Sequence, residues 1–164
     1  MAAKMSYYID APVESVFDFF MDPNNQVDTP VFGDMKVHEV KMTKEGVGSY
    51  YGWSVKMFGI PITGFEVVTD FVPNKRITEK SSNAMVGTWE YTFEPEGSGT
   101  KVTMEHRQRS FWAVPPLRNL MDYAVPRLSR SYIKAAKAEL ETKAAVPSQR
   151  KPASTKPRKP AASR

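Results

Sequence analysis

The apolar positions of this chain change period three times, and each change marks a new kind of element. Over residues 13–21 they recur every three or four positions, the spacing of one buried stripe on a helix. Pro12 stands where a first helical residue belongs, and the pair at 22–23 ends the helix. A short strand around residues 5–9 precedes it. Residues 24–30 are polar and predict a loop or one short helical turn.

From Gly33 to Ser110 the period is two, with turn signals between the runs, which predicts a meander of about six antiparallel strands. Large apolar side chains alternate with polar ones, so one face of the sheet is expected to be aromatic and the other exposed to solvent. The same parity places His106 on the apolar side and Glu105 on the opposite side. The positions assigned to the apolar face are Tyr51, Trp53, Val55, Met57, Phe65, Val67, Phe71, Trp89, Tyr91, Phe93, Val102 and Met104.

The helical period returns after Pro116 and continues through Glu141. Pro126 lies inside this segment and is expected to kink it. Because this helix carries the large apolar stripe that remains, it is expected to cover the aromatic face of the sheet. The chain is therefore predicted to be an α+β domain, a curved antiparallel sheet wrapped around a long C-terminal helix.

Charge separates the C-terminus from the rest of the chain. The net charge is +5, and the segment 145–164 contains no acid. We expect one domain over residues 1–143 and a disordered basic Pro/Ala/Lys tail over 144–164. Such a tail is attracted to nucleic acid or anionic membranes by charge alone, or it is only a solubilising terminus. Its basic residues are Arg150, Lys151, Lys156, Arg158, Lys159 and Arg164.

Composition excludes several kinds of chemistry. The chain has no cysteine, so disulfides, thiolate nucleophiles and cysteine-ligated metals are ruled out. Two histidines are too few for a convincing zinc cluster, and we expect neither a metal nor a cofactor. No apolar run reaches the length of a membrane span, which favours a soluble cytoplasmic protein. The sequence does not indicate an oligomeric state.

Several segments resemble the START-like, or SRPBCC, superfamily, and within it the polyketide cyclase/dehydrase-like proteins. The resemblance covers roughly residues 3–143 in the expected order. It implies a helix-grip fold with a hydrophobic cavity between sheet and C-terminal helix, which other members use for lipids, sterols, polyketides or plant hormones. These motifs serve the fold, so no catalytic residue is carried over. The segments are Tyr8–Phe17, Gly46–Ser49, Phe71–Ile77, Thr88–Pro95 and Gly99–Thr103.

The aromatic face and the covering helix together supply the candidate ligand-binding residues. Large rings and flexible methionines line either a dry core or a pocket, and the resemblance favours the pocket. The leading hypothesis is binding, with possible transport or sequestration, of a hydrophobic small molecule such as a lipid or polyketide-like compound. The candidate residues are Trp53, Met57, Phe65, Trp89, Tyr91, Met104, His106, Leu120, Met121 and Ala124.

His106 is the weak candidate for catalysis. An inward histidine in an apolar cavity is either a general base or a polar anchor for a ligand oxygen. Its neighbour Glu105 points away, and no other sequence feature supplies an orienting partner, so a core histidine or ligand contact is favoured. The rival hypotheses are a cyclase or dehydratase that uses His106, and a protein that acts through its basic tail on nucleic acid or anionic membrane.

Overall fold

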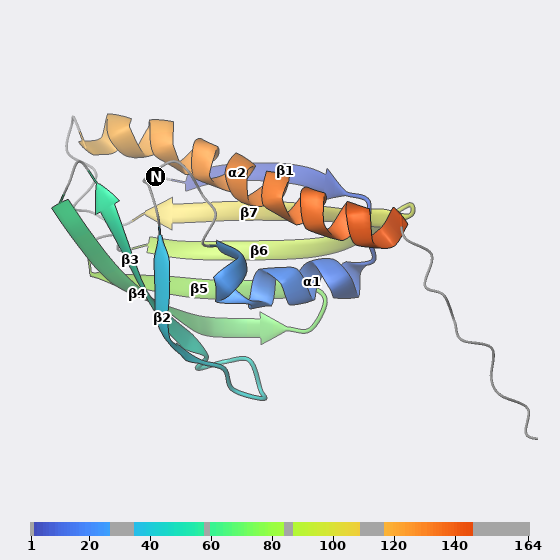
Figure 1. Cartoon of the computed structure of the whole chain (residues 1–164), viewed down its shortest axis with the longest axis horizontal. Helices are drawn as coiled ribbons and strands as arrows, with labels where there is room; N and C mark the ends of the chain where they lie inside the picture. The colour runs from blue at the N-terminus through green and yellow to red at the C-terminus, as the bar shows by residue number, and fades with distance from the viewer. Residues whose placement is uncertain (1, 27–34, 58–59, 84–86, 109–116, 146–164) are drawn as a thin grey trace, which may run out of the picture.

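A computed structural model describes residues 2–26, 35–57, 60–83, 87–108 and 117–145 of the chain (Figure 1). The elements in chain order are β1 (Ala2–Ile9), α1 (Val13–Met21), the 3₁₀ helix η1 (Pro23–Gln26), β2 (Lys36–Lys41), β3 (Tyr50–Met57), β4 (Ile60–Val72), β5 (Arg76–Asn83), β6 (Gly87–Glu96), β7 (Gly99–Gln108) and α2 (Leu117–Ala145).

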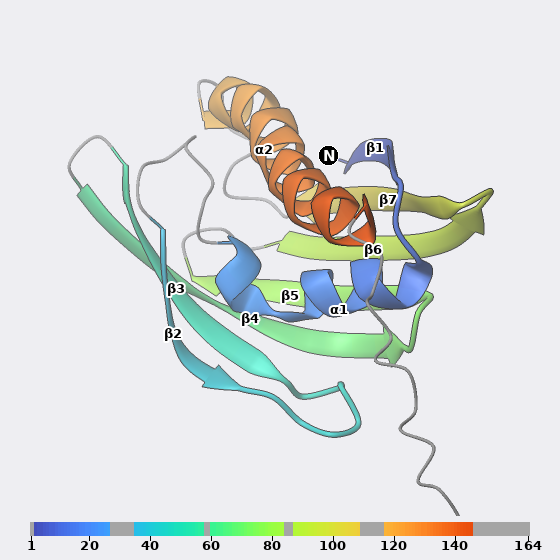
Figure 2. The ribbon, with the colours of Figure 1, turned by 45° about the vertical axis from the view of Figure 1, so that its right-hand side comes forward.

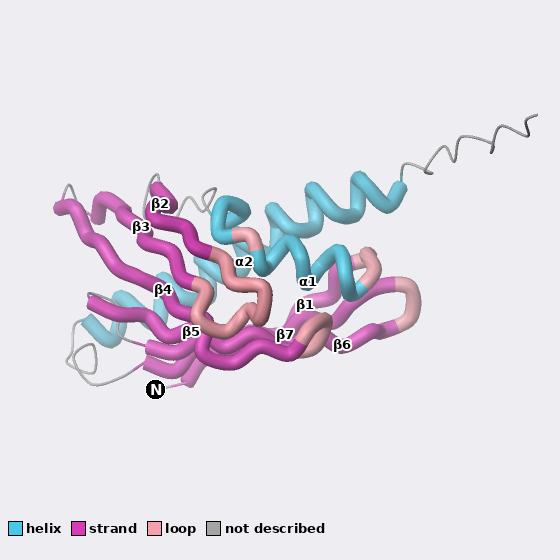
Figure 3. Tube along the Cα trace, turned by 90° about the horizontal axis from the view of Figure 1, so that it is seen from below, coloured by secondary structure: helices cyan, strands magenta, loops and turns pink. Residues whose placement is uncertain are grey.

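The strands form one antiparallel sheet in the order β1-β7-β6-β5-β4-β3-β2. β1 pairs with β7 along its whole length, from Ala2 opposite Arg107 to Ile9 opposite Thr100, so the first and last strands are neighbours. The sheet is strongly curved, and both α-helices lie on its concave side (Figures 2 and 3). The predicted meander and the α+β helix-grip architecture are confirmed.

Helix α1 fills one end of the concave face. It begins directly after Pro12 and buries Phe17 and Phe20. The Phe17 ring meets those of Phe71 and Phe93 edge-on, with centroids 5.4 and 5.2 Å apart. Edge-to-face pairs of this kind add stability beyond the area that they bury. This end of the sheet is therefore closed by the protein's own aromatic side chains.

Helix α2 crosses the concave face and begins at the end of the sheet where β7 ends (Figure 1). Pro126 lies inside the helix, as expected, and the helix continues past Glu141 to Ala145. Its second half buries Tyr132, Ile133, Ala136 and Leu140 against the sheet and α1. This stripe is the cover that the sequence pattern predicted.

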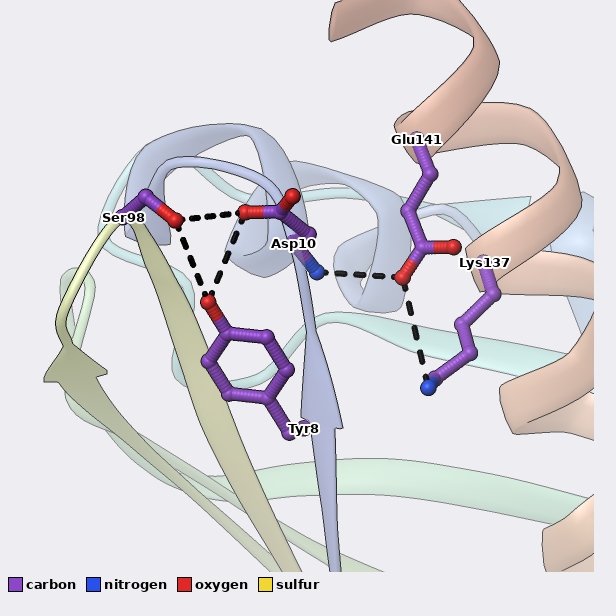
Figure 4. Close-up of polar contacts among 5 residues, drawn as sticks. All are labelled: Tyr8, Asp10, Ser98, Lys137 and Glu141. Atoms are coloured by element: carbon purple, nitrogen blue, oxygen red, sulfur yellow. Dashed lines mark hydrogen bonds and ion pairs between the residues drawn. The ribbon is translucent and has the colours of Figure 1, made fainter.

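Polar contacts hold the far end of α2 against the sheet (Figure 4). The backbone N–H of Asp10 donates to Glu141 Oε1 at 3.1 Å. Ser98 Oγ donates to Asp10 Oδ1 at 2.7 Å, and the Tyr8 hydroxyl lies 3.3 Å from the same Ser98 oxygen. These contacts join the end of β1, the turn between β6 and β7, and the last turns of α2.

A β-bulge in β4 overturns one part of the predicted face. The register shifts between Val68 and Asp70, so the extra residue inverts the alternation along the strand. Phe71 faces inward as predicted, but the inward prediction for Phe65 and Val67 is wrong. Phe65 lies opposite Gly52 and packs near the His38 ring on the convex face, with centroids 6.3 Å apart.

Candidate functional site

The concave face gathers many of the predicted site residues. Trp53, Trp89, Tyr91, Met104 and His106 all point into it from β3, β6 and β7. Phe65 does not, because the bulge in β4 leaves it on the convex face. Four more predicted residues lie in β3 and α2, but their side chains fall outside the described part of the structure: Met57, Leu120, Met121 and Ala124.

His106 lies in an aromatic stack. Its ring is 4.2 Å from that of Trp89, which in turn stacks on Tyr91 at 6.2 Å. The histidine is 4% exposed, and burial lowers its pKa to about 4. It is therefore neutral near pH 7, and among the described residues no tyrosine or carboxylate hydrogen-bonds to it. The inward prediction is confirmed, and the surroundings are those of a packed ring.

The concave face also holds three polar residues that the sequence pattern did not assign to it. Glu66 on β4 and Glu79 and Ser81 on the adjacent β5 are all buried, and we call them the buried acid cluster. In the register, Glu66 lies directly opposite Ser81. They were missed because the bulge inverts the parity of β4, and because acids on a strand ordinarily face water. The spacing of Glu79 and Ser81 from Ile77, at every second position, was the available signal.

The cluster lies between two separate groups of packed apolar side chains. Tyr51, Trp53 and Val55 form one group, and the large core around α1 forms the other. Ser81 Oγ lies 2.6 and 2.7 Å from the two carboxyl oxygens of Glu66 and donates to them. The indole Nε1 of Trp53 donates to Glu66 Oε1 at 3.3 Å. Glu66 is therefore well supplied with donors.

Glu79 is less well supplied. The Tyr51 hydroxyl donates to its Oε2 at 3.5 Å, the outer limit of a hydrogen bond. Among the described residues, no lysine, arginine or histidine forms an ion pair with Glu79 or Glu66. A buried carboxylate without a cation is costly, because nothing replaces the hydration that it loses.

Burial shifts both carboxyl pKa values upward. The pKa of Glu66 rises to about 7 through burial, against the hydrogen bonds from Ser81 and Trp53, which lower it. The pKa of Glu79 rises to about 8, through burial and then through repulsion from Glu66. Near pH 7 the two acids therefore share a proton between them rather than carrying two full charges.

Three buried tyrosines lie within electrostatic range of Glu79. Tyr51 comes from β3, Tyr91 from β6 and Tyr132 from α2, and burial followed by the charge of Glu79 raises each phenolic pKa. The Tyr132 ring packs 4.7 Å from that of Phe20. Its hydroxyl is buried and has no hydrogen-bond partner among the residues that the structure describes.

Solved structures share this fold at low sequence identity. A START superfamily protein from Mycobacterium smegmatis is 13% identical, with a TM-score of 0.68 over 86% of this chain and 97% of that chain. Protein Ms6760 from the same organism is 19% identical, with a TM-score of 0.67 over 87% and 92%. The di-domain ARO/CYC StfQ from the steffimycin biosynthetic pathway is 16% identical, with a TM-score of 0.69 over 88% of this chain and 52% of that chain.

No curated protein matches the chain. Within the described residues, no helix has both the length and the apolar character needed to cross a membrane. The family model described as polyketide cyclase / dehydrase and lipid transport matches residues 2–145, a span that includes every described residue. With its curved sheet and covering helix, the chain belongs to this family of polyketide cyclase / dehydrase and lipid transport proteins.

Proposed function

We propose that this protein binds a hydrophobic small molecule, such as a lipid or a polyketide-like compound, on the concave face of its sheet beneath α2. The observation that carries the proposal is the buried Tyr132 hydroxyl, which finds no partner among the described residues and lies within electrostatic range of Glu79. A polar group buried without a partner costs free energy, and a ligand atom would satisfy it.

The apolar surroundings support the same proposal. Trp53 and Trp89 lie on either side of the buried acid cluster along the sheet, and α2 covers the face. Binding would be driven by the removal of apolar area from water, worth roughly 25 cal/mol per Å² before the costs of ordering. The family description includes both lipid transport and polyketide chemistry, and both involve apolar molecules.

The experiment is native mass spectrometry of the purified chain after incubation with a lipid and metabolite extract. We expect one retained small molecule. A matched pair of variants then locates it: Trp89→Leu on the concave face and Phe65→Leu on the convex face, both half-buried aromatics of the same sheet. Trp89→Leu should reduce retention at least tenfold, and Phe65→Leu should leave it unchanged. Equal effects, or no retained molecule, would contradict the proposal.

A cyclase or dehydratase activity is a second candidate, and one observation favours it. Paired carboxyls whose pKa values lie near neutrality, here Glu66 and Glu79, are suited to moving protons. His106, the weak catalytic candidate from the sequence, is neutral and stacked on Trp89. The same mass spectra test it, because an active dehydratase would return its ligand with the mass of one water less.

A further inference from the structure

The buried acid cluster places two carboxyl groups in the interior of the protein. Glu66 and Glu79 are 7% and 5% exposed and lie on adjacent strands, facing the same side of the sheet. Among the described residues, no lysine, arginine or histidine forms an ion pair with either acid. Folding alone gains little from two such acids, because apolar side chains of similar size would pack there at lower cost.

The two acids differ in how many hydrogen bonds their carboxyl oxygens already accept. Glu66 accepts from both Ser81 and Trp53. Glu79 accepts one long hydrogen bond, from Tyr51 at 3.5 Å, and a carboxylate has room for several. Free acceptor capacity in this cluster therefore lies mainly on Glu79.

Tyr132 supplies an independent sign that something else binds here. It comes from α2 rather than from the sheet, is 5% exposed, and has no hydrogen-bond partner for its hydroxyl in the described part of the chain. The charge of Glu79 acts on this hydroxyl, as it does on those of Tyr51 and Tyr91. An incoming group near Glu79 would thus meet a free phenolic oxygen as well.

The aromatic rings around the two acids indicate which kind of ligand group suits the buried acid cluster. Tyr51, Trp53 and Tyr91 lie on the same face as the carboxyls, and aromatic faces attract cations, most strongly when water is excluded. Calcium needs six to eight oxygen ligands. No group of three or more potential metal ligands is found among the described residues. Carboxylate, phenolic oxygen and aromatic rings together suit an organic ammonium ion better than a metal.

We infer that the buried acid cluster binds the ammonium head of an amphiphilic amine, whose alkyl or aryl part lies along the apolar concave face. This inference rests on the proposed function and names its ligand class. The ammonium takes the place of the proton that the two acids share, so binding releases a proton near pH 7. The groups near Glu79 are Glu66 from β4, Tyr51 from β3, Tyr91 from β6 and Tyr132 from α2. None of these side chains carries a positive charge, and His106 on β7 is neutral.

The test compares two ligands that differ only in the head group, 1-aminodecane and 1-decanol, by isothermal titration calorimetry of the full chain. At pH 8.5 we expect the amine to bind at least tenfold more tightly, and this advantage should shrink at pH 6 as protons compete. Titrations at pH 7 in buffers of different ionisation enthalpy should show proton release with the amine and none with the alcohol.

Variants assign the effect to the cluster. Glu79→Gln should remove the advantage of the amine and leave alcohol binding unchanged, whereas Glu45→Gln, which removes a charge from an exposed turn, should change neither. Tyr132→Phe deletes only the unpaired hydroxyl and should weaken amine binding severalfold; it also provides the test if Glu79→Gln does not fold.

Each outcome separates this inference from the proposed function. If the alcohol binds as tightly as the amine, or if amine affinity rises as the pH falls, the ammonium site is wrong while hydrophobic binding stands. If Glu79→Gln or Tyr132→Phe folds and leaves the amine advantage intact, the inference is also overturned. If neither ligand binds, and the extract yields no retained molecule, the proposed function fails with it.

Discussion

At the scale of single residues, the buried acids set how stability depends on pH. In the unfolded chain Glu66 and Glu79 have ordinary pKa values, and folding raises them to about 7 and about 8. Between the unfolded and folded pKa values the native state therefore binds more protons, so these acids lower stability as the pH rises through that window. His106 acts in the opposite direction, but only below pH 6.5, because its pKa falls on folding.

The first prediction uses the window above pH 6.5, where the acids act alone. The free energy of unfolding of the native chain should fall by about 2 kcal/mol between pH 6.5 and 8 because of Glu79, at about 1.4 kcal/mol per pH unit. Glu79→Gln, which is neutral at every pH, should remove most of this fall. Urea denaturation at a series of pH values measures it.

The matched control for this series is Glu45→Gln, an exposed acid in the turn after β2. It should keep the pH dependence of the native chain. A Glu79→Gln variant that loses stability above pH 6.5 as steeply as the native chain would show that Glu79 is ionised well below neutral pH. The inference that the two acids of the buried acid cluster share a proton near pH 7 would then be wrong.

At the scale of elements, the turns that join the strands depend on backbone conformations that favour glycine. Gly46, between β2 and β3, has φ of +76°, and a Cβ there would overlap the Phe71 ring. Gly97, between β6 and β7, has φ of +59°, but nothing lies within 4 Å of a Cβ built on it. The two positions share the backbone requirement and differ in their surroundings.

The second prediction follows from that difference. Gly97→Ala should cost about 1 kcal/mol of stability, from the left-handed backbone alone. Gly46→Ala should cost at least about 3 kcal/mol, because Phe71 must also move from its place against α1. Thermal denaturation of the two variants compares them directly. Equal losses would mean that the turn after β2 is not packed against Phe71.

The elements themselves were largely predictable from sequence, because each has a strong local signal. The apolar stripe of α1, the period of two along β6 and β7, and the stripe of α2 all appear where the pattern placed them. The bulge in β4 was not predictable, because Phe65, Val67 and Phe71 fit a single period of two in the sequence. The register shift near Thr69 nevertheless changes which of these residues face inward. The buried acids of the candidate site were therefore missed, and Phe65 was assigned to the wrong face.

At the scale of the whole molecule, the sequence follows the domain with a C-terminal segment that carries basic residues and no acid. The tail that the sequence predicts as disordered lies outside the described residues, apart from its first two positions, 144 and 145, at the end of α2. Its role stays a prediction that rests on charge. An acid-free segment attracts phosphates through released counterions, and that attraction weakens as salt increases.

The third prediction separates the tail from the domain. Deleting residues 146–164 removes all six basic residues of the tail and should abolish salt-dependent binding to DNA and to anionic vesicles. The deletion should leave retention of the hydrophobic ligand unchanged, because α2 ends at Ala145. Cosedimentation at low and high salt measures the first effect. If the shortened chain binds DNA and vesicles as before, the tail is not the cationic surface.

The fourth prediction concerns the binding of a hydrophobic molecule on the concave face of the sheet. Methionine methyl groups labelled with ¹³C distinguish the concave face from a site outside the sheet, because Met104 lies buried on β7 and Met42 is 46% exposed beyond β2. NMR titration with the compound retained in the native mass spectra should shift the Met104 methyl signal, with saturation, and leave the Met42 signal in place. A Met104 signal that stays unchanged while Met42 shifts would contradict binding on the concave face.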